Sequence, residues 1–327
     1  MPKVGCRLFE YIVRRIVYGL LILLVMTVFT FVVMRLVPGD VVTLQLAQAG
    51  VVSEEQMAAL KSEMGLDKPV WQQLLIWLKD ALQGDLGTSL WSQQPVMDMI
   101  AKRLPVTLEL VGLSVIISLL VGIPLGVIAA VKHGKWADQL IRVTAITGLS
   151  IPNFWLGLLI ITFLSLWFGW IPPIAYRSFL EDPAVNLQKM ILPALALAVT
   201  LSASTIRMTR SALLEVLHSD FIRTVRAKGA SERIVIYKHA LRNSLISVVT
   251  LVGLQIGILL GGTVVLEYIF SIPGMGSLIF ETVSNRDYPV VQACVLIYGG
   301  MFILVNLLVD ITYGWIDPRI RHQSSNA

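Results

Sequence analysis

The chain contains six apolar stretches that are each long enough to cross a lipid bilayer. A transmembrane helix needs about 20 predominantly apolar residues. The stretches that qualify lie near 12–36, 104–131, 139–168, 190–206, 245–267 and 289–313. Only 14% of the 327 residues are charged, against about 25% in average soluble domains. We therefore expect an all-α integral membrane protein with six transmembrane helices.

Basic residues are distributed unevenly over the segments that join these stretches. With the N-terminus in the cytoplasm, the cytoplasmic segments 1–15, 132–142, 207–243 and 316–327 together hold 17 Lys and Arg residues, and the segments on the other side hold 6. Cytoplasmic loops of membrane proteins carry an excess of Lys and Arg. Both termini are therefore predicted to be cytoplasmic. The first stretch follows two arginines and is too long for a secretory signal, so we expect it to be retained as a helix.

The segment lengths suggest how the chain is organised. Residues 1–37 are predicted to form an N-terminal segment and the first transmembrane helix. Residues 38–101 are too many for a connector and contain helix-like stretches and three tryptophans, so they are predicted to form a small extracytoplasmic helical insert. Residues 102–316 are expected to form a five-helix core with a long cytoplasmic loop at 207–243. Residues 317–327 form a cytoplasmic tail.

The loop 207–243 carries eight Lys and Arg residues and three acidic ones, which is more charge than a simple chain reversal needs. Asp220 is placed to cap a short helix that runs to Lys228. Gly229 follows it and can adopt the left-handed conformation that closes a helix. A second helix is predicted to return from Glu232 toward the fifth stretch.

The short helix has two faces of different character. Phe221, Ile222 and Val225 form one apolar patch, and Arg223 and Arg226 lie three residues apart on another face. An apolar face flanked by basic residues suits docking into a groove of a partner protein. The alternative is a basic loop that follows the charge rule and contacts lipid headgroups.

At these residues the chain resembles the permease subunits of ABC importers. The run Asp220–Gly229 (DFIRTVRAKG), followed by His239–Asn243 (HALRN), is similar to the coupling loop in the branch that imports dipeptides, oligopeptides and nickel chelates. The resemblance covers nearly the whole chain. It includes Gly84–Gly87, Phe270–Gly276 and Arg286–Gln292.

The resemblance implies a type I, MetI-like permease fold in a bacterial inner membrane, in contact with lipid and not with nucleic acid. Such a chain forms half of a translocation pathway for di- or oligopeptides or similar small solutes. Its expected partners are a homologous second permease, two ABC ATPase subunits and an extracytoplasmic substrate-binding protein. The residues implied to couple to the ATPases are Asp220, Phe221, Arg223, Arg226, Ala227, Gly229, His239 and Arg242.

Within the predicted spans, a few residues are candidates for the pathway or for helix packing. Gly253, Gly257 and Gly261 recur at four-residue intervals, a spacing that lets helix backbones approach closely. Gln255 and Ser202 are polar at membrane depth and need a partner or a wet cavity. Packing within one subunit is an equally good interpretation of the glycines.

The sequence shows no metal-binding or catalytic constellation and no Walker-type phosphate loop. The chain is therefore expected not to be an enzyme and to bind no cofactor itself, with ATP and Mg²⁺ used by its partners. Three alternatives remain open. One is a permease for nickel chelates or glutathione in the same family. Another is a secondary transporter driven by an ion gradient. The third is a membrane scaffold that transports nothing.

Overall fold

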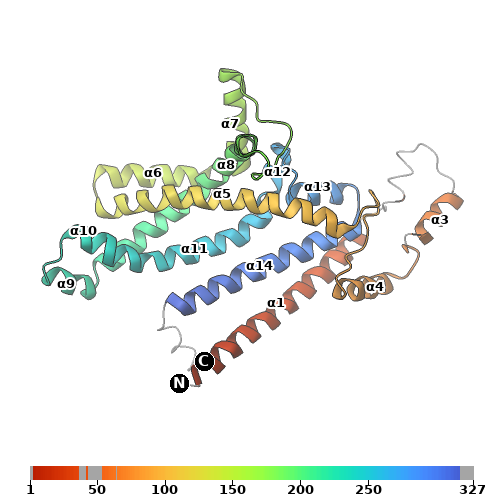
Figure 1. The fold of residues 1–327 in the computed structure, drawn as a ribbon, viewed down its shortest axis with the longest axis horizontal. Helices are drawn as coiled ribbons and strands as arrows, with labels where there is room; N and C mark the ends of the chain where they lie inside the picture. The colour runs from red at the N-terminus through yellow and green to blue at the C-terminus, as the bar shows by residue number, and fades with distance from the viewer. Residues whose placement is uncertain (1–2, 37–41, 43–53, 64, 317–327) are drawn as a thin grey trace. The chain divides into compact units, whose positions relative to one another are not determined.

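The computed structural model describes residues 3–36, 42, 54–63 and 65–316. The predicted tail 317–327 and the first part of the predicted insert, except Val42, lie outside the described residues. By its internal contacts the chain divides into two units. One comprises residues 1–107 and 273–304, and the other comprises 108–272 and 305–327. Every regular element in the described residues is a helix (Figure 1).

Five helices are long and apolar enough to span a membrane, and a bent pair raises the number to six if it counts as one span. The five lie in α1 (Lys3–Leu36), α5 (Val96–Val131), α8 (Pro183–Leu217), the run from Glu232 to Gly262, and α14 (Tyr288–Ile316). These agree with five of the predicted spans. The prediction of an all-α, multi-pass membrane protein is confirmed.

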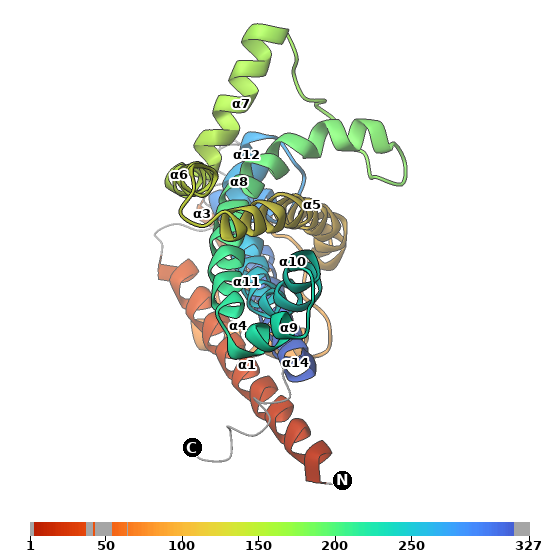
Figure 2. The same ribbon diagram turned by 90° about the vertical axis from the view of Figure 1, so that its left-hand side faces the viewer.

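The predicted third span is broken. It consists of α6 (Trp136–Ser150) and α7 (Asn153–Phe168), which meet at an angle of 98°. The bend falls at Ile151 and Pro152, both in extended conformations. Proline disfavours the helical conformation in the residue before it and has no amide hydrogen to donate. Figure 2 shows α7 leaving the direction of α6 at this point.

The predicted fourth span was placed too narrowly. The sequence predicts it at 190–206, with Pro193 making its first residue hard to define. In the structure α8 begins at Pro183, continues through Pro193 and reaches Leu217. The Asp182 side chain caps it by accepting a hydrogen bond from the Val185 amide at 3.2 Å. Its apolar window is 72% buried, more than that of any other candidate span in the described residues. Helices α6, α7 and α11 contact α8, and proline is tolerated inside transmembrane helices where neighbouring groups satisfy the freed backbone carbonyl.

The predicted fifth span, 245–267, also needs correction at both ends. Helical structure begins at Glu232, and α11 (Leu241–Gly262) ends one residue before Thr263, after which the separate helix α12 (Val264–Ile269) follows. A hydrogen bond from the Thr263 hydroxyl to the buried Glu267 carboxylate, 2.9 Å long, spans this break. The sequence predicted a single span here because α11 and α12 are both apolar, so the apolar run continues across the break between them.

In the first unit, α1 packs against α14 through small residues. A side chain added at Gly19 would meet Ile303 at 2.7 Å, and one added at Gly299 would meet Leu23 at 2.8 Å. Such close approach is typical of membrane helices with glycine at the contact. The two stretches predicted to be helical in the insert are α3 (Glu54–Glu63) and α4 (Val70–Leu82).

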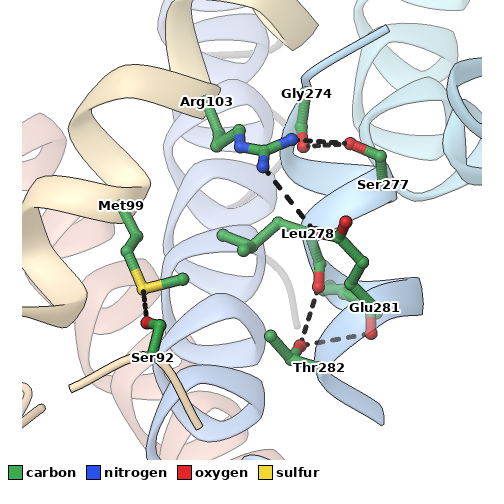
Figure 3. A network of polar contacts seen from close by, with 9 residues as sticks. Ser92, Met99, Arg103, Gly274, Ser277, Leu278, Glu281 and Thr282 are labelled. Atoms are coloured by element: carbon green, nitrogen blue, oxygen red, sulfur yellow. Dashed lines mark hydrogen bonds and ion pairs between the residues drawn. The ribbon is translucent and has the colours of Figure 1, made fainter. Parts of the chain in front are cut away.

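The start of α5 is tied to α13 (Met275–Ser284) by polar contacts (Figure 3). Arg103 donates to the Ser277 hydroxyl at 3.3 Å and pairs with Glu281 at 3.7 Å. The Met275 amide donates to the buried Thr107 hydroxyl at 2.8 Å. These contacts connect segments about 170 residues apart in the chain.

Asp287, just before α14, holds the turn that follows α4. Its carboxylate is buried and accepts hydrogen bonds from the Ser89 hydroxyl and from the Leu90 amide. Burial raises the pKa of Asp287, although these donors and the amides of Trp91 and Val290 oppose the shift. A buried carboxylate with several donors is a structural clamp on this turn.

In the second unit, the loop between α7 and α8 is held by two polar anchors. Lys189, buried in α8, donates to the carbonyl oxygens of Pro173 and Ile174 at 2.8 and 3.1 Å. The Tyr176 hydroxyl donates to Glu109 at 2.8 Å. Burial and this hydrogen bond raise the pKa of Tyr176, which therefore stays a neutral donor.

Candidate functional site

The charged loop predicted to carry function folds into a short helix and a return helix at one end of the second unit. The short helix α9 covers Asp220–Ala227. The return begins with the single turn α10 (Glu232–Ile234), continues through a π-helical segment η1 (Val235–Ala240) and leads into α11. Figure 1 shows α9 and α10 where α8 ends and α11 begins. The prediction of two helices separated by a break is confirmed.

Ile222 anchors α9 to the body of the second unit. Its side chain is fully buried and packs in a cluster with residues of α5, α8 and η1, namely Val127, Ala130, Leu213, Val235 and Ala240. An isolated eight-residue helix is not stable in water, so this packing is what holds α9 in place. A displacement of α9 would therefore act directly on the ends of two long helices.

The predicted apolar patch of Phe221, Ile222 and Val225 does not form one outward face. Ile222 points into the protein, Val225 is partly buried and packs against the same cluster, and only Phe221 is half exposed. The apolar spacing along the helix was correct. It marked mainly the side that packs inward, because an amphipathic helix buries its apolar stripe against its own core when one is available.

The outward side of α9 is smaller and more polar. Phe221 is 50% exposed and meets the ring of His239 edge to face, with 6.0 Å between the ring centroids. Arg223 and Ala227 of α9 are also exposed, and Arg242 is exposed at the start of α11. The structure thus brings Phe221 and His239 together from segments separated in sequence, as part of one surface.

The predicted capping role of Asp220 is wrong. The helix begins at Asp220 itself, Ser219 occupies the capping position, and no side chain caps the first amides. The Asp220 carboxylate instead accepts a hydrogen bond from Arg223 at 3.1 Å, and both side chains are almost fully exposed. A carboxylate inside the first turn reaches the residue three positions on and still interacts favourably with the helix dipole.

We expected Arg226 to lie on the outer face of α9, available to a partner protein. It instead forms an ion pair across the turn that follows α9. Its guanidinium binds Glu232 through two hydrogen bonds of 2.8 and 3.2 Å. Glu232 holds the pKa of Arg226 above its ordinary value through this contact. Between them the backbone of Gly229 is left-handed, with φ of +81°. The predicted role of Gly229 in ending the helix is therefore confirmed by its conformation.

The π-helical segment η1 was not predicted. Six consecutive residues from Val235 to Ala240 follow this wider winding. Such segments occur mostly as single turns inside α-helices and often at functional sites. Here η1 carries His239 toward Phe221 and places Val235 and Ala240 in the cluster around Ile222. A cleft of about 320 Å³ lies beside it, with His133, His218, Arg226 and Glu232 among its lining residues.

The residues predicted within the membrane do not share one environment. A side chain added at Gly253 would overlap Val309 of α14 within the same unit. Gly257 is buried, but nothing lies near the position a side chain would take at Gly261, which is exposed. Ser202 is buried in α8, and Gln255 is partly exposed. The glycine stripe therefore begins as a packing contact and ends on an open surface.

Two features near this site escaped the sequence reasoning. Asp138 of α6 is 1% exposed and forms a bidentate ion pair with Arg210 of α8, with distances of 2.7 and 2.8 Å. Gly122 and Gly126 of α5 lie so close to α8 that side chains there would meet Thr205 and Thr209. The Gly-x-x-x-Gly spacing at 122–126 is a sequence signal for such packing. Nothing in the local sequence around Asp138 identifies Arg210 as its partner.

In the described part of the chain, no three His, Cys, Asp or Glu side chains are grouped to hold a metal ion. What the site presents is an exposed helix, anchored by one buried residue and tied to the ends of membrane-spanning helices. Such an arrangement can receive a mechanical displacement from another protein. Fold and site together define a multi-pass membrane protein with a short exposed helix between two of its long helices.

Comparison with known proteins identifies the family. Residues 122–322 match the family model for the inner membrane component of binding-protein-dependent transport systems, and residues 8–111 match the model for its N-terminal part. The chain belongs to this family. It is the permease subunit of an ABC importer, a transport component and not an enzyme, and ATP is hydrolysed on partner subunits.

Two relatives and one solved structure illustrate the match. The dipeptide transport system permease protein DppB of Alkalihalophilus pseudofirmus is 40% identical over 95% of this chain and 99% of its own length. DppB of Escherichia coli K12 is 41% identical over 96% of this chain and 99% of its own. An inward-facing structure of the MetNI methionine ABC transporter aligns with a TM-score of 0.51 and 18% identity, over 68% of this chain and 97% of that one. This last match supports the fold alone.

Proposed function

We propose that this chain forms half of a translocation pathway for dipeptides or short oligopeptides. Support comes from the relatives named as dipeptide permeases, which align over nearly the full length. The other half is a homologous second permease, and an extracytoplasmic binding protein delivers the peptide. Two ATPase subunits, which use ATP and Mg²⁺, drive transport. The comparisons give no support to a secondary transporter driven by an ion gradient.

The observation that carries the coupling part of this proposal is the two-sided character of α9. Its inner side is fixed by the fully buried Ile222, and its outer side presents Phe221, Arg223 and Ala227 to solvent. The Arg226–Glu232 ion pair keeps the following turn closed. Motion of an ATPase against the outer side is then passed through Ile222 to α5, α8 and η1. The spans respond by alternating the opening of the pathway between the two sides of the membrane.

We place α9 and both termini in the cytoplasm. The segments assigned to that side hold 17 Lys and Arg residues against 6 on the other, in keeping with the positive-inside rule. Within the membrane, we assign Gln255 to a face that borders the pathway, because a polar side chain at this depth needs a partner or a wet cavity and Gln255 is partly exposed in this subunit. Gly261, six residues further on, is exposed on another side of α11. Gly253 serves packing within the subunit.

Co-purification with the ATPase subunits tests the docking surface. Arg223→Glu reverses a charge on the outer side of α9 and is expected to abolish recovery of the ATPases with the permease. Arg233→Glu makes the same change at an exposed site on α10, beyond the closed turn, and is expected to leave recovery intact. Equal loss in both variants would mean that overall loop charge, not docking on α9, holds the complex.

Reconstitution tests the substrate. The permease pair, the ATPases and the binding protein are placed in vesicles, and uptake of a radiolabelled dipeptide is compared with uptake of a nickel chelate and of glutathione. We expect dipeptide uptake that depends on ATP. Uptake of a nickel chelate or of glutathione without dipeptide uptake would refute the peptide assignment and retain the importer.

A further inference from the structure

Helix α4 carries an apolar stripe that no other described part of the chain covers. Trp71, Leu75 and Leu82 are 65%, 58% and 89% exposed. With Leu78 they occupy positions i, i+4, i+7 and i+11, which share one face of a helix. Among the described residues, α4 has no buried side chain. An exposed apolar stripe of this length is costly in water.

The opposite side of α4 faces the rest of the first unit. Gln73 accepts two hydrogen bonds from Arg35, of 3.1 and 2.9 Å, and Ala81 packs against a buried cluster that includes Leu86 and Ile100. Lys79 and Gln72 are exposed and lie between the two sides. The helix therefore has one side that contacts the protein and an apolar stripe on another side.

The contact with Arg35 sets the depth of α4 relative to the bilayer. Arg35 lies in the last turn of α1, whose span ends at Leu36. Its guanidinium also stacks on the ring of Phe31 at 3.6 Å, so its position is fixed. Figure 1 shows α4 beside the C-terminal part of α1. Since α1 spans the membrane, α4 lies at the level where the hydrocarbon ends and the headgroups begin.

The surface of α1 next to this level is apolar and exposed as well. Phe29 is 66% and Leu36 is 75% exposed in its last two turns, as expected for side chains that face lipid. Helix α4 has 13 residues, so it is about 20 Å long and too short to cross a core of about 30 Å. Its apolar stripe can meet lipid only by lying along the surface.

We infer that α4 is an interfacial helix that lies on the membrane with Trp71, Leu75, Leu78 and Leu82 immersed in the boundary between headgroups and acyl chains. Helices of this kind bury their apolar face about 5–10 Å into that boundary. Tryptophan is enriched at this depth because its ring is apolar and its N–H is polar. Helix α4 thus rests on the bilayer surface beside the end of α1.

Spin-label accessibility in lipid nanodiscs tests this inference without any transport measurement. In a cysteine-free background (C6S, C294A), single cysteines replace Leu75, Leu82 and Lys79. Labels at 75 and 82 are expected to collide with oxygen, which concentrates in lipid, and to be shielded several-fold from a water-soluble nickel chelate. The label at 79 lies at the edge of the stripe and is expected to be more accessible to the nickel chelate than the labels at 75 and 82.

A label at Val25, exposed in the middle of α1, provides the reference for full immersion, and positions 75 and 82 are expected to be shallower. Nickel accessibility at 75 and 82 equal to that at 79 would overturn the inference, because the stripe would face water. Low accessibility to both reagents would also overturn it, since a second protein subunit would then cover the stripe. Shielding that appears only when a binding protein is added would show a docking surface for that protein instead.

Discussion

Removing the anchor of α9 provides the sharpest test of how this loop is held. Ile222 is 0% exposed and its packing partners come from three other elements. Replacing a buried isoleucine with alanine costs about 2–5 kcal/mol. Since 1.4 kcal/mol is a factor of ten in an equilibrium constant, Ile222→Ala should raise the opening equilibrium of α9 about 30-fold or more.

Hydrogen exchange measured by mass spectrometry on the permease in nanodiscs reports this opening. We expect faster exchange in peptides that cover Asp220–Lys228 and unchanged exchange in the middle of α8 and α11. Ile222→Val removes one methyl group and costs about 0.5–1.5 kcal/mol, so its effect should be roughly 2- to 13-fold. Thr224→Ala, on the exposed side of α9, is the matched control and should change little.

Two results would refute the reasoning. Unchanged exchange in α9 of Ile222→Ala would mean that another contact holds the helix. Equal acceleration through α8 and α11 would mean that Ile222 supports the whole unit and not α9 in particular.

Three further predictions concern buried contacts, and thermal unfolding of the purified protein in detergent measures each. Arg210→Met leaves Asp138 as a buried charge without its partner, a loss of about 3–5 kcal/mol, and adding Asp138→Asn should recover much of the lost melting temperature. Gly253→Ala should reduce the free energy of unfolding by about 1–3 kcal/mol and so lower the melting temperature, because Val309 fills the space that the added methyl group needs. Gly261→Ala should have little effect. Burial raises the pKa of Asp287, so the folded state holds its proton more tightly than the unfolded state. Stability from this group is therefore lost as pH rises from 3.8 through the raised pKa, and the melting temperature of wild type relative to Asp287→Asn should fall across that range.

The membrane architecture could be predicted from the sequence because it depends on local composition. A span needs a continuous apolar run, and such runs are visible without knowledge of any contact. The break in the third span was in principle visible too, since Pro152 follows Ile151 within the run. The full extent of α8 was not, because its tolerance of Pro193 depends on helices packed around it.

In the charged loop 207–243, too, local sequence predicted some features and tertiary packing decided others. The spacing of Phe221, Ile222 and Val225 predicted an amphipathic helix, and Gly229 predicted its end. The direction in which the apolar side points depended on whether a core lay behind it, and that core is assembled from α5, α8 and η1. Likewise, Arg226 was assigned to a partner protein because the sequence does not show that Glu232 returns to meet it.

By itself, the sequence determined the fold class, the approximate spans, the charge asymmetry and the position of the charged loop 207–243, because each follows from residues close together in the chain. The tertiary structure alone decided which side of α9 is buried, that Asp138 pairs with Arg210, and that α4 is held beside the end of α1. The Arg35–Gln73 and Asp138–Arg210 contacts join residues 38 and 72 positions apart, and no local pattern specifies a partner at that distance. The physical reason is that burial and pairing are properties of the packed chain, whereas hydropathy and charge belong to each residue.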